Sequence, residues 1–423
     1  MNARYVVAFS GGCDSTVLLH AVTRTHPGKL LAVHVCHHMQ PHCQRWIAHC
    51  ESTCRDWAVP LTVRSVDIPP HPPEGPEAAA RKARYRALAQ VMEPGDIVVT
   101  AHHADDQAET VLLQALRGAG VRGLAAMPAR MQFGRGILAR PLLRVPRREL
   151  FAYARDHGLG WVEDPSNRDR RVDRSYLRDA VWPALAARWP AAAATLGRVA
   201  RHQAETATLL SDLAELDLAA CAGDAGATLA IASLSRLGAA RFDNAVRHWL
   251  AGLDLPMPDH RHLAQVRVQA VSARRDAQPC IVWADAEVRR YRDCLYAMRS
   301  LFPVPEQWHA PWRPPQALSL PTDCGWLRAD PVTGTGLRAD LHPLRVSLRQ
   351  GGESLRLPGR AHRSSLSKLL QAARIPPWVR ARMPLLWSGE QLVAVADRWL
   401  CDGCVAGSGQ PGWRVRWRDA PAG

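Results

Sequence analysis

The first residues that could do chemistry form the segment 10–15, which reads SGGCDS and stands between two apolar runs. An apolar strand, a glycine turn and a helix start in this order make a cradle of backbone amides that binds phosphate groups. Gly11 and Gly12 let a phosphate approach the backbone closely because they carry no Cβ atom. Asp14 would repel that phosphate unless a Mg²⁺ ion lay between them. The segment therefore predicts a site for a nucleotide with its metal ion.

Two other kinds of phosphate-binding loop are excluded by the same residues. A Walker A loop needs Gly-Lys-Ser/Thr after its first glycines, and no lysine follows here. A dinucleotide-binding fingerprint needs a third glycine, which is also missing. An ordinary strand-to-helix turn remains as the alternative to a nucleotide site.

A second group of reactive side chains follows the apolar run 97–100 and reads HHADDQAET at 102–110. Either Asp105 or Asp106 is explained by the capping of a following helix. Two adjacent carboxylates beside two histidines are more than a cap requires. The additional carboxylate could hold Mg²⁺ or accept a proton from a reacting group.

Two basic segments could contact a substrate. The predicted helix 77–91 carries Arg81, Lys82, Arg84 and Tyr85 within two turns, a pattern that suits contact with phosphate or a nucleic-acid backbone. A solvated basic face is the alternative for this helix. The segment 161–178 mixes arginines with aspartates, and a linker with solvated ion pairs is its alternative.

The net charge of +15 indicates a polyanionic partner such as nucleic acid, and part of this charge is concentrated late in the chain. Between residues 345 and 389 stand nine basic residues and a single acidic one, Glu353. Trp378 and Trp387 lie in the same segment. Basic and aromatic side chains together suit RNA binding through phosphate contacts and base stacking.

Eleven cysteines are scattered through the chain, and the sequence contains no secretory or transmembrane stretch. This usage indicates a cytoplasmic protein with reduced thiols and no membrane partner. The cysteines and histidines of segment 34–54 raise the alternative of a zinc site. Cys50 and Cys54 fall on the apolar face of a predicted helix, which favours a packed core. Cys401 and Cys404 form a lone CxxC pair, which does not by itself indicate zinc.

The elements that must position these side chains alternate between strands and helices up to about residue 165. The predicted strands are 5–9, 30–35, 61–66 and 97–100, and the predicted helices are 15–24, 43–57, 77–91 and 105–117. This order predicts an α/β fold with a Rossmann-like parallel sheet covered by helices on both faces. Because ligands bind at the carboxyl ends of such strands, residues 9–15, 34–38 and 101–106 are expected to converge on one crevice.

The rest of the chain predicts a mainly helical middle domain and a small α+β C-terminal domain. Helices are expected at 176–188 and 191–220. The many prolines of segment 303–321 predict a linker. The last domain is expected to hold strands at 344–348 and 392–395 and a helix at 364–373. The predicted domains are therefore 1–172, 173–302 and 322–423, with the linker 303–321 before the last of them.

Together these motifs closely resemble the tRNA(Ile)-lysidine synthetases, a family of PP-loop ATP pyrophosphatases, over nearly the whole chain. The SGGxDS loop indicates only the superfamily, whereas the later motifs, their order and the basic C-terminal domain single out this family. The matching stretches are 8–16, His34-Val35, Ala80-Arg81, Arg84-Tyr85, 100–110, Arg117-Gly118, 140–143, Glu163-Asp164, Ser166-Asn167, Asp173-Arg174 and 375–378.

The resemblance implies a ligase that uses ATP to join free L-lysine to the wobble cytidine in the CAU anticodon of tRNA(Ile). ATP would first adenylate the oxygen at the 2-position of the base. The ε-amine of lysine would then displace AMP to give lysidine, which changes the codon read from AUG to AUA. The implied domains are a PP-loop adenylation domain, a helical substrate and tRNA domain, and a basic tRNA-binding domain.

The resemblance also implies roles for individual residues. Those implied in ATP binding are Ser10, Gly11, Gly12, Cys13, Asp14 and Ser15. Those implied in catalysis are Asp14, Asp105, Asp106 and Arg117, of which Asp14 and Asp105 would hold Mg²⁺. Those implied in substrate binding are Arg81, Arg84, Glu149 and Arg174. The chain departs from the family at His38, where glycine is common, and at Ser175, where asparagine is usual.

Other functions stay open on the sequence. A tRNA thiolase of the same superfamily would need cysteines beside the loop to carry sulfur or an iron–sulfur cluster, and Cys13 lies at the variable loop position. An ammonia-dependent ligase of the same fold would not need the basic C-terminal domain. A tRNA-binding protein with an inactive nucleotide loop is a rival of another class, and the complete set of loop and acidic residues argues against it. The sequence leaves open whether the protein forms a homodimer.

Overall fold

The computed structural model describes residues 3–36, 43–69, 72, 75–163, 172–223, 227–274 and 277–418. The chain divides into two compact units, Met1–Asp212 and Leu213–Gly423, and the boundary falls within the long helix α9 (Ala192–Ala220). Among the described residues, none of the helices combines the length and the apolar character needed to cross a membrane.

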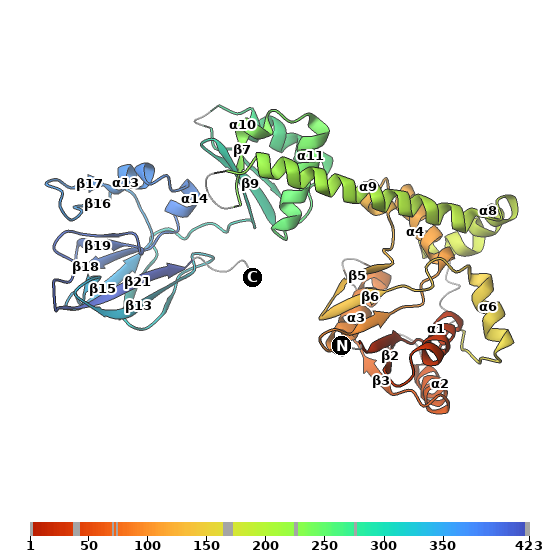
Figure 1. Cartoon of the computed structure of the whole chain (residues 1–423). Coiled ribbons are helices and arrows are strands. Elements are labelled where there is room, and N and C mark those ends of the chain that lie inside the picture. Colours follow the sequence, from red (N-terminus) through yellow and green to blue (C-terminus); the bar gives the residue numbers. More distant parts are fainter. Residues whose placement is uncertain are drawn as a thin grey trace. The chain divides into compact units, whose positions relative to one another are not determined.

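A six-stranded sheet with the order β3-β2-β1-β4-β6-β5 organises the first unit (Figure 1). Its strands are β1 (Tyr5–Ala8), β2 (Leu30–Cys36), β3 (Leu61–Ser65), β4 (Ile97–Val99), β5 (Arg130–Phe133) and β6 (Gly136–Ala139). Neighbouring strands run parallel, except that β5 and β6 form an antiparallel hairpin. The four predicted strands and the parallel sheet are confirmed. The hairpin was not predicted because β5 is a largely exposed edge strand without an apolar run.

Helices cover both faces of this sheet because the side chains of each strand alternate between two apolar layers. Val7 of β1 packs in one core with Leu18 and Cys50, and Val6 packs in another core with Leu88. The helices are α1 (Cys13–Thr25), α2 (Cys43–Asp56), α3 (Pro76–Gln90), α4 (Ala104–Leu116), α5 (Val121–Leu124) and α6 (Arg147–Asp156). The predicted helices 15–24, 43–57, 77–91 and 105–117 are therefore confirmed.

The end of the first unit is helical. It comprises α7 (Asp173–Tyr176), a π-helical turn (Leu177–Val181), α8 (Trp182–Arg188) and the first part of α9. The predicted helices 176–188 and 191–220 are confirmed, with a π-helical turn added within the first of them.

Two cysteines of the first unit lie in its apolar core, as predicted, and do not form a zinc site among the described residues. Cys50 and Cys54 are free thiols buried beneath the sheet, as the apolar helix face predicted. Cys36, at the end of β2, is disulfide-bonded, so the expectation of reduced thiols is wrong for this residue.

The second unit begins with an antiparallel sheet of order β7-β10-β9-β8 packed with helices. The strands are β7 (Leu229–Ala230), β8 (Cys280–Trp283), β9 (Ala286–Tyr291) and β10 (Cys294–Met298); the helices are α10 (Ile231–Leu234), α11 (Ala239–Gly252) and α12 (His260–Gln265), followed by a π-helical stretch (Val266–Val271). The prediction that this part of the chain is mainly helical is confirmed. The four-stranded sheet was not predicted. Strand β9 escaped prediction because it buries the charged residues Glu287 and Arg290, which hides the usual apolar alternation.

The rest of the second unit, residues 309–418, forms a C-terminal module. It contains two larger antiparallel sheets around one apolar core. The first has the order β11-β15-β18-β19-β20, with β11 (His309–Trp312), β15 (Leu344–Ser347), β18 (Leu385–Ser388), β19 (Gln391–Val395) and β20 (Trp399–Leu400). The second has the order β12-β13-β21-β14, with β12 (Leu318–Ser319), β13 (Trp326–Thr333), β14 (Leu337–Arg338) and β21 (Pro411–Arg418). A two-stranded sheet, β16 (Ser354–Leu355) with β17 (Ser364–Ser365), and helices α13 (Leu366–Ala372) and α14 (Pro377–Arg380) complete it.

The proline-rich segment 303–321 differs from the predicted linker, because β11 and β12 lie within it and join the two larger sheets. Pro311 is accommodated since β11 is an edge strand, where a missing backbone donor costs no ladder hydrogen bond. The predicted strands 344–348 and 392–395 and the predicted helix 364–373 are confirmed.

Candidate active site

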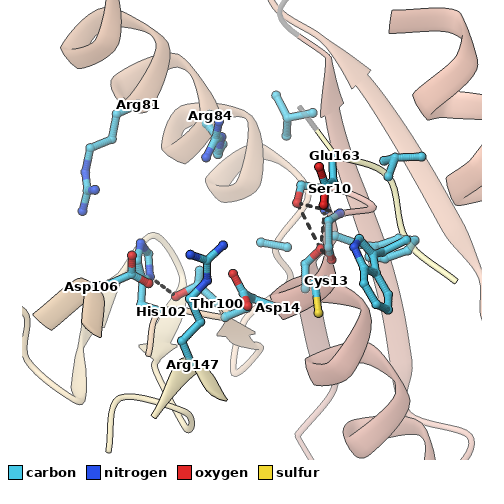
Figure 2. Close-up of a pocket in the computed structure, with 18 of the residues that line it drawn as sticks. Ser10, Cys13, Asp14, Arg81, Arg84, Thr100, His102, Asp106, Arg147 and Glu163 are labelled. Carbon is cyan, nitrogen blue, oxygen red and sulfur yellow. Dashed lines mark hydrogen bonds between the residues drawn. The ribbon is translucent and has the colours of Figure 1, made fainter. Parts of the chain in front are cut away.

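A cavity of about 460 Å³ lies in the first unit at the carboxyl ends of β1 and β4 (Figure 2). Strand β1 lies between β2 and β4 in the sheet, and the chain continues from β1 to β2 on one side and later returns to β4 on the other. The order of the strands therefore reverses between β1 and β4, which is the switch point of the sheet. The walls come from the loops after β1 and β4, from α3, from the start of α6 and from residues 161–163 and 178–179. The predicted convergence of residues 9–15 and 101–106 is therefore confirmed.

The glycine loop leads directly into α1. Gly12 is the residue before the helix, and no described side chain caps it, so the first amides of α1 remain available to an anion. Gly11 has a φ of 82°, and a Cβ atom there would lie 3.0 Å from the Sγ atom of Cys50. A side chain at this position would be strained by the backbone conformation and would press against the packing around the loop.

Hydroxyl groups hold the loop in shape. The Ser10 amide donates to the Oγ atom of Ser15 at 3.2 Å, and the two hydroxyls lie 3.0 Å apart. The hydroxyls of Ser15 and Thr16 both donate to the Gly12 carbonyl at 3.0 Å. These hydrogen bonds within the loop hold it in one conformation.

Asp14 and the second acidic turn meet at the imidazole of His103, which is buried. The Nε2 atom of His103 lies 3.6 Å from Asp14 Oδ2 and 3.4 Å from Asp106 Oδ2. Burial acts to lower the pKa of His103, but the interaction with the nearby carboxylates of Asp14, Asp106 and Asp105 outweighs burial and raises it. The Oδ1 atom of Asp14 is buried and has no hydrogen-bond partner among the described residues. This uncompensated oxygen beside the loop suits a cation ligand.

The adjacent carboxylates of the second turn have different surroundings. Asp106 lines the cavity, and its Oδ2 atom accepts the His103 amide at 3.1 Å as part of a capping box at the start of α4. Asp105 is not among the residues that line the cavity, and its Oδ2 atom accepts the Arg147 amide at the start of α6 at 2.8 Å. Asp105 thus positions α6, whereas Asp106 faces the cavity.

Arginines enter the cavity from several elements. Figure 2 shows Arg81 and Arg84 on α3 and Arg147 at the start of α6. The Nε atom of Arg147 is buried and lacks a hydrogen-bond partner among the described residues. Sequence reasoning missed Arg147, since no local pattern marks it. It proposed Arg117 instead, which ends α4, is largely exposed, pairs with Asp173 at 3.4 Å and does not line the cavity.

Two titratable lining residues are held in their neutral forms. Burial, with a smaller contribution from the charge of Asp14, raises the pKa of the Cys13 thiol to about 11. Burial and nearby arginines lower the pKa of His102 to about 3, and its Nδ1 atom lies 2.8 Å from the Thr100 hydroxyl. Cys13 therefore presents a thiol to the cavity rather than a reactive thiolate.

Comparison with known families and proteins agrees with this geometry. A family profile described as "PP-loop domain" matches residues 1–185, one described as "TilS substrate binding domain" matches residues 229–296, and one described as "TilS substrate C-terminal domain" matches residues 344–417. The tRNA(Ile)-lysidine synthase of Methylococcus capsulatus is 42% identical to this chain, covering 94% of it and 92% of the relative. The chain belongs to the tRNA(Ile)-lysidine synthase family.

Two further relatives bear the same name. The tRNA(Ile)-lysidine synthase of Alkalilimnicola ehrlichii is 43% identical and matches over 97% of this chain and 92% of its own length. That of Coxiella burnetii is 39% identical and matches over 98% of this chain and 93% of its own length. The resemblance noted from the motifs is confirmed over almost the full chain.

In this lysidine synthase family member, Glu109 anchors the segment that follows the cavity. Its carboxylate is 2% exposed and accepts from the Nε atoms of Arg174 at 2.9 Å and Arg178 at 2.8 Å. Both arginines also reach Asp106 Oδ1 at 3.3 Å. Arg178 lines the cavity, and Arg174 is engaged in this network. These ion pairs fasten residues 173–181 to α4.

The remaining predicted positions lie outside the cavity or outside the described residues. Glu149 is exposed in the first turn of α6 and is not among the lining residues. Ser175 lies in α7. His38 and the motif residues Asp164, Ser166 and Asn167 lie outside the described residues.

Proposed function

We propose that this chain joins free L-lysine to the wobble cytidine of the CAU anticodon of tRNA(Ile), using ATP and passing through an adenylated cytidine. The observation that carries the proposal is that one cavity combines the amide cradle of α1, the carboxylates of Asp14 and Asp106 and several arginines. Family membership supports the same reaction. Cytoplasmic tRNA and ATP are the substrates that we assign to it.

Mg²⁺ fits the residues of this cavity. The described residues hold no group of three or more histidine, cysteine or acidic side chains arranged for a metal ion. Mg²⁺ commonly needs only one or two carboxylates when nucleotide phosphates and water complete its shell. Asp14, with its unpartnered Oδ1 atom, would hold the ion, and Asp106 is nearer to this role than Asp105 because it lines the cavity. When bound, the ion would neutralise phosphate charge during adenylation.

We assign the phosphates of ATP to the first amides of α1 and to Arg147. Replacing Arg147 with glutamine is expected to raise the KM for ATP about 10- to 100-fold, because a charged hydrogen bond contributes about 1.5–3 kcal/mol. The helix start should persist, since Asp105 holds the backbone amide of Arg147 and not its side chain. Steady-state rates of adenylation at varied ATP concentration measure the effect.

Arg117→Gln is the matched control for this prediction. It removes one guanidinium from the same unit, outside the cavity. The KM for ATP should stay near that of the unchanged protein. A larger effect at Arg117 than at Arg147 would restore the role that sequence reasoning gave to Arg117.

The amino groups of lysine need carboxylates, and three other than Asp14 line the cavity: Asp106, Glu163 and Asp179. Asp106 belongs to the acidic turn that we assign to Mg²⁺, whereas Glu163 and Asp179 line the cavity from other segments of the chain. Both come from segments on either side of residues 164–171. We propose these two, in place of the exposed Glu149, as the acidic residues that bind lysine.

The protonated thiol of Cys13 argues against the alternative function as a tRNA thiolase. A sulfur carrier must form a thiolate readily, and a thiol with a pKa of about 11 stays protonated near neutral pH. The ligase proposal needs no chemistry at Cys13.

Incubation of the protein with ATP, Mg²⁺, labelled lysine and tRNA transcripts tests the proposed function. We expect label to enter an isoleucine tRNA with a CAU anticodon, with one AMP released for each lysine joined. A methionine tRNA with the same anticodon serves as the control. Failure to label any isoleucine transcript while tRNA binding persists would refute ligation and favour the binding-only alternative.

A further inference from the structure

Trp378 is a buried side chain of α14 that makes its ring contacts outside its own module. Its neighbours Ile375, Val379 and Met383 pack into the apolar core of the C-terminal module. Trp378 is 8% exposed, yet it is absent from the described residues of that core and of the core on the sheet β7-β10-β9-β8, here called the middle sheet. The segment around α14 therefore turns one side to its own module and presents Trp378 on another side.

The contacts of Trp378 lie on the side of the middle sheet that faces away from the core of that sheet. Val288 and Leu295 pack in the core. Since side chains alternate along a strand, Arg289 and Tyr291 of β9 and Tyr296 of β10 lie on the opposite side. Tyr296 stands directly opposite Arg289 in the strand pairing, so the three side chains are neighbours on one surface.

Trp378 lies against all three of these side chains. Its ring centroid is 5.2 Å from that of Tyr296 and 6.1 Å from that of Tyr291, and both pairs meet edge to face. The guanidinium carbon of Arg289 lies 5.4 Å from the Trp378 ring centroid. Edge-to-face aromatic pairs and cation–π contacts depend on direction, so they favour one placement of the ring. We call Arg289, Tyr291, Tyr296 and Trp378 the aromatic cluster.

Hydrogen bonds lie beside the aromatic cluster. Arg380, also on α14, donates from Nη2 to the Tyr291 hydroxyl at 2.9 Å. Arg292, which follows β9, donates from Nη2 to the Gln371 carbonyl of α13 at 3.0 Å. Both bonds join the C-terminal module to the middle sheet, so they fix the direction of α13 and α14 against that sheet.

The chain between the middle sheet and the C-terminal module, residues 299–308, forms neither helix nor strand. Arg382 donates from Nη2 to the carbonyl of Phe302, and Asp323 accepts the Phe302 amide at 3.2 Å. A cavity of about 400 Å³, lined in part by Phe302 and Trp378, lies beside these contacts. The junction therefore depends on few side chains rather than on a broad apolar interface, and one substitution should loosen it.

We propose that Trp378 is a positioning residue that, through the aromatic cluster, fixes the orientation of the C-terminal module on the middle sheet. The module carries the basic segment 345–389. An orientation that is fixed before RNA arrives reduces the entropy lost on binding. Trp378 would then lower the KM for RNA without touching the RNA or the reacting atoms. The identity of the RNA rests on the proposed function, whereas the orientation does not.

Hydrogen exchange of the full chain tests the fixed orientation. In Trp378→Ala, we expect the amides of residues 299–308 to exchange about five- to tenfold faster, the effect of losing about one aromatic pair. Exchange of the β18–β19 hairpin should stay that of the unchanged protein, because Trp378 is not among the described core residues of the module. Equal acceleration of the hairpin, or no change within residues 299–308, would overturn the proposal.

Tyr296→Leu tests the junction from the middle sheet, and it decides the question if Trp378→Ala fails to fold. It should reproduce the faster exchange within residues 299–308. Trp378→Phe should restore nearly normal exchange, because phenylalanine can keep the edge-to-face and cation–π contacts. Trp399→Ala is the matched control, since Trp399 of β20 packs on the core of the same module. Acceleration within residues 299–308 by Trp399→Ala but not by Tyr296→Leu would contradict the role of the cluster.

Kinetic constants separate positioning from catalysis. Trp378→Ala should raise the KM for a tRNA(Ile) transcript about tenfold and leave the KM for ATP and kcat unchanged. Tyr296→Leu should show the same split, because it disturbs the same junction. A fall in kcat, or an unchanged KM for the transcript, would overturn the positioning role. Absence of lysine incorporation by the unchanged protein would instead refute the ligase proposal, and hydrogen exchange tests the junction without any substrate.

Discussion

Replacing Asp14 with asparagine is expected to lower the rate of adenylation and of lysine incorporation by about 10²–10³-fold, the usual effect of losing one preorganised electrostatic group. The amide keeps the size of the side chain but removes the negative charge that we assign to Mg²⁺. It also removes one of the carboxylates that face the imidazole of His103. The measurements are AMP release and labelled lysine per tRNA under single-turnover conditions.

Two controls make the Asp14 result specific. Asp156→Asn changes an exposed aspartate at the end of α6, outside the cavity, and should leave both rates unchanged. The tRNA affinity of Asp14→Asn should match that of the unchanged protein, because the amide keeps the size of the side chain and the lost charge is assigned to Mg²⁺ and not to RNA. An Asp14→Asn protein with normal turnover would remove Asp14 from the mechanism and support a binding-only protein.

Replacing Glu109 with glutamine is expected to lower the free energy of unfolding of the first unit by about 3 kcal/mol, because breaking a buried ion pair costs about 3–5 kcal/mol. Arg174 and Arg178 would lose their shared carboxylate while remaining close to Asp106. Urea unfolding measures the loss, and faster hydrogen exchange within residues 173–181 would locate it.

Glu205→Gln is the matched control for Glu109→Gln. Glu205 pairs with Arg201 one turn away on α9, and both side chains are largely exposed. The loss there should not exceed about 0.5 kcal/mol, as for other exposed pairs. Equal losses for the two glutamine variants would mean that the Glu109 network does not stabilise residues 173–181.

The sequence predicted the parts of the site that short-range signals encode. The glycine loop and the turn at 102–106 each follow an apolar strand and precede a helix, so alternation of strands and helices places both at one sheet edge. The fold class followed from the same alternation. The family resemblance then supplied the reaction, which neither charge nor spacing could have specified.

The sequence could not select the arginines that face the cavity. Arg147 enters it because α6 starts where Asp105 holds the Arg147 amide, a contact between residues far apart in the chain. Arg117 instead lies at the exposed end of α4. Similarly, the contact of Trp378 with Tyr291 and Tyr296 depends on packing that no local pattern reports. Because such contacts join residues far apart in the chain, the sequence predicted the helices and strands better than the positions of individual side chains.

The pairing of β13 with β21 also bears on how the C-terminal module is assembled. It joins residues 326–333 to residues 411–418, so a long stretch of chain must be closed before the ladder can form. Strands β18 and β19 are close neighbours in the sequence and pair with little closure entropy. We therefore expect the β18–β19 hairpin to form early and the β13–β21 ladder late in folding. The C-terminal module would then pass through a state in which the β18–β19 hairpin has formed while β13 and β21 are still unpaired.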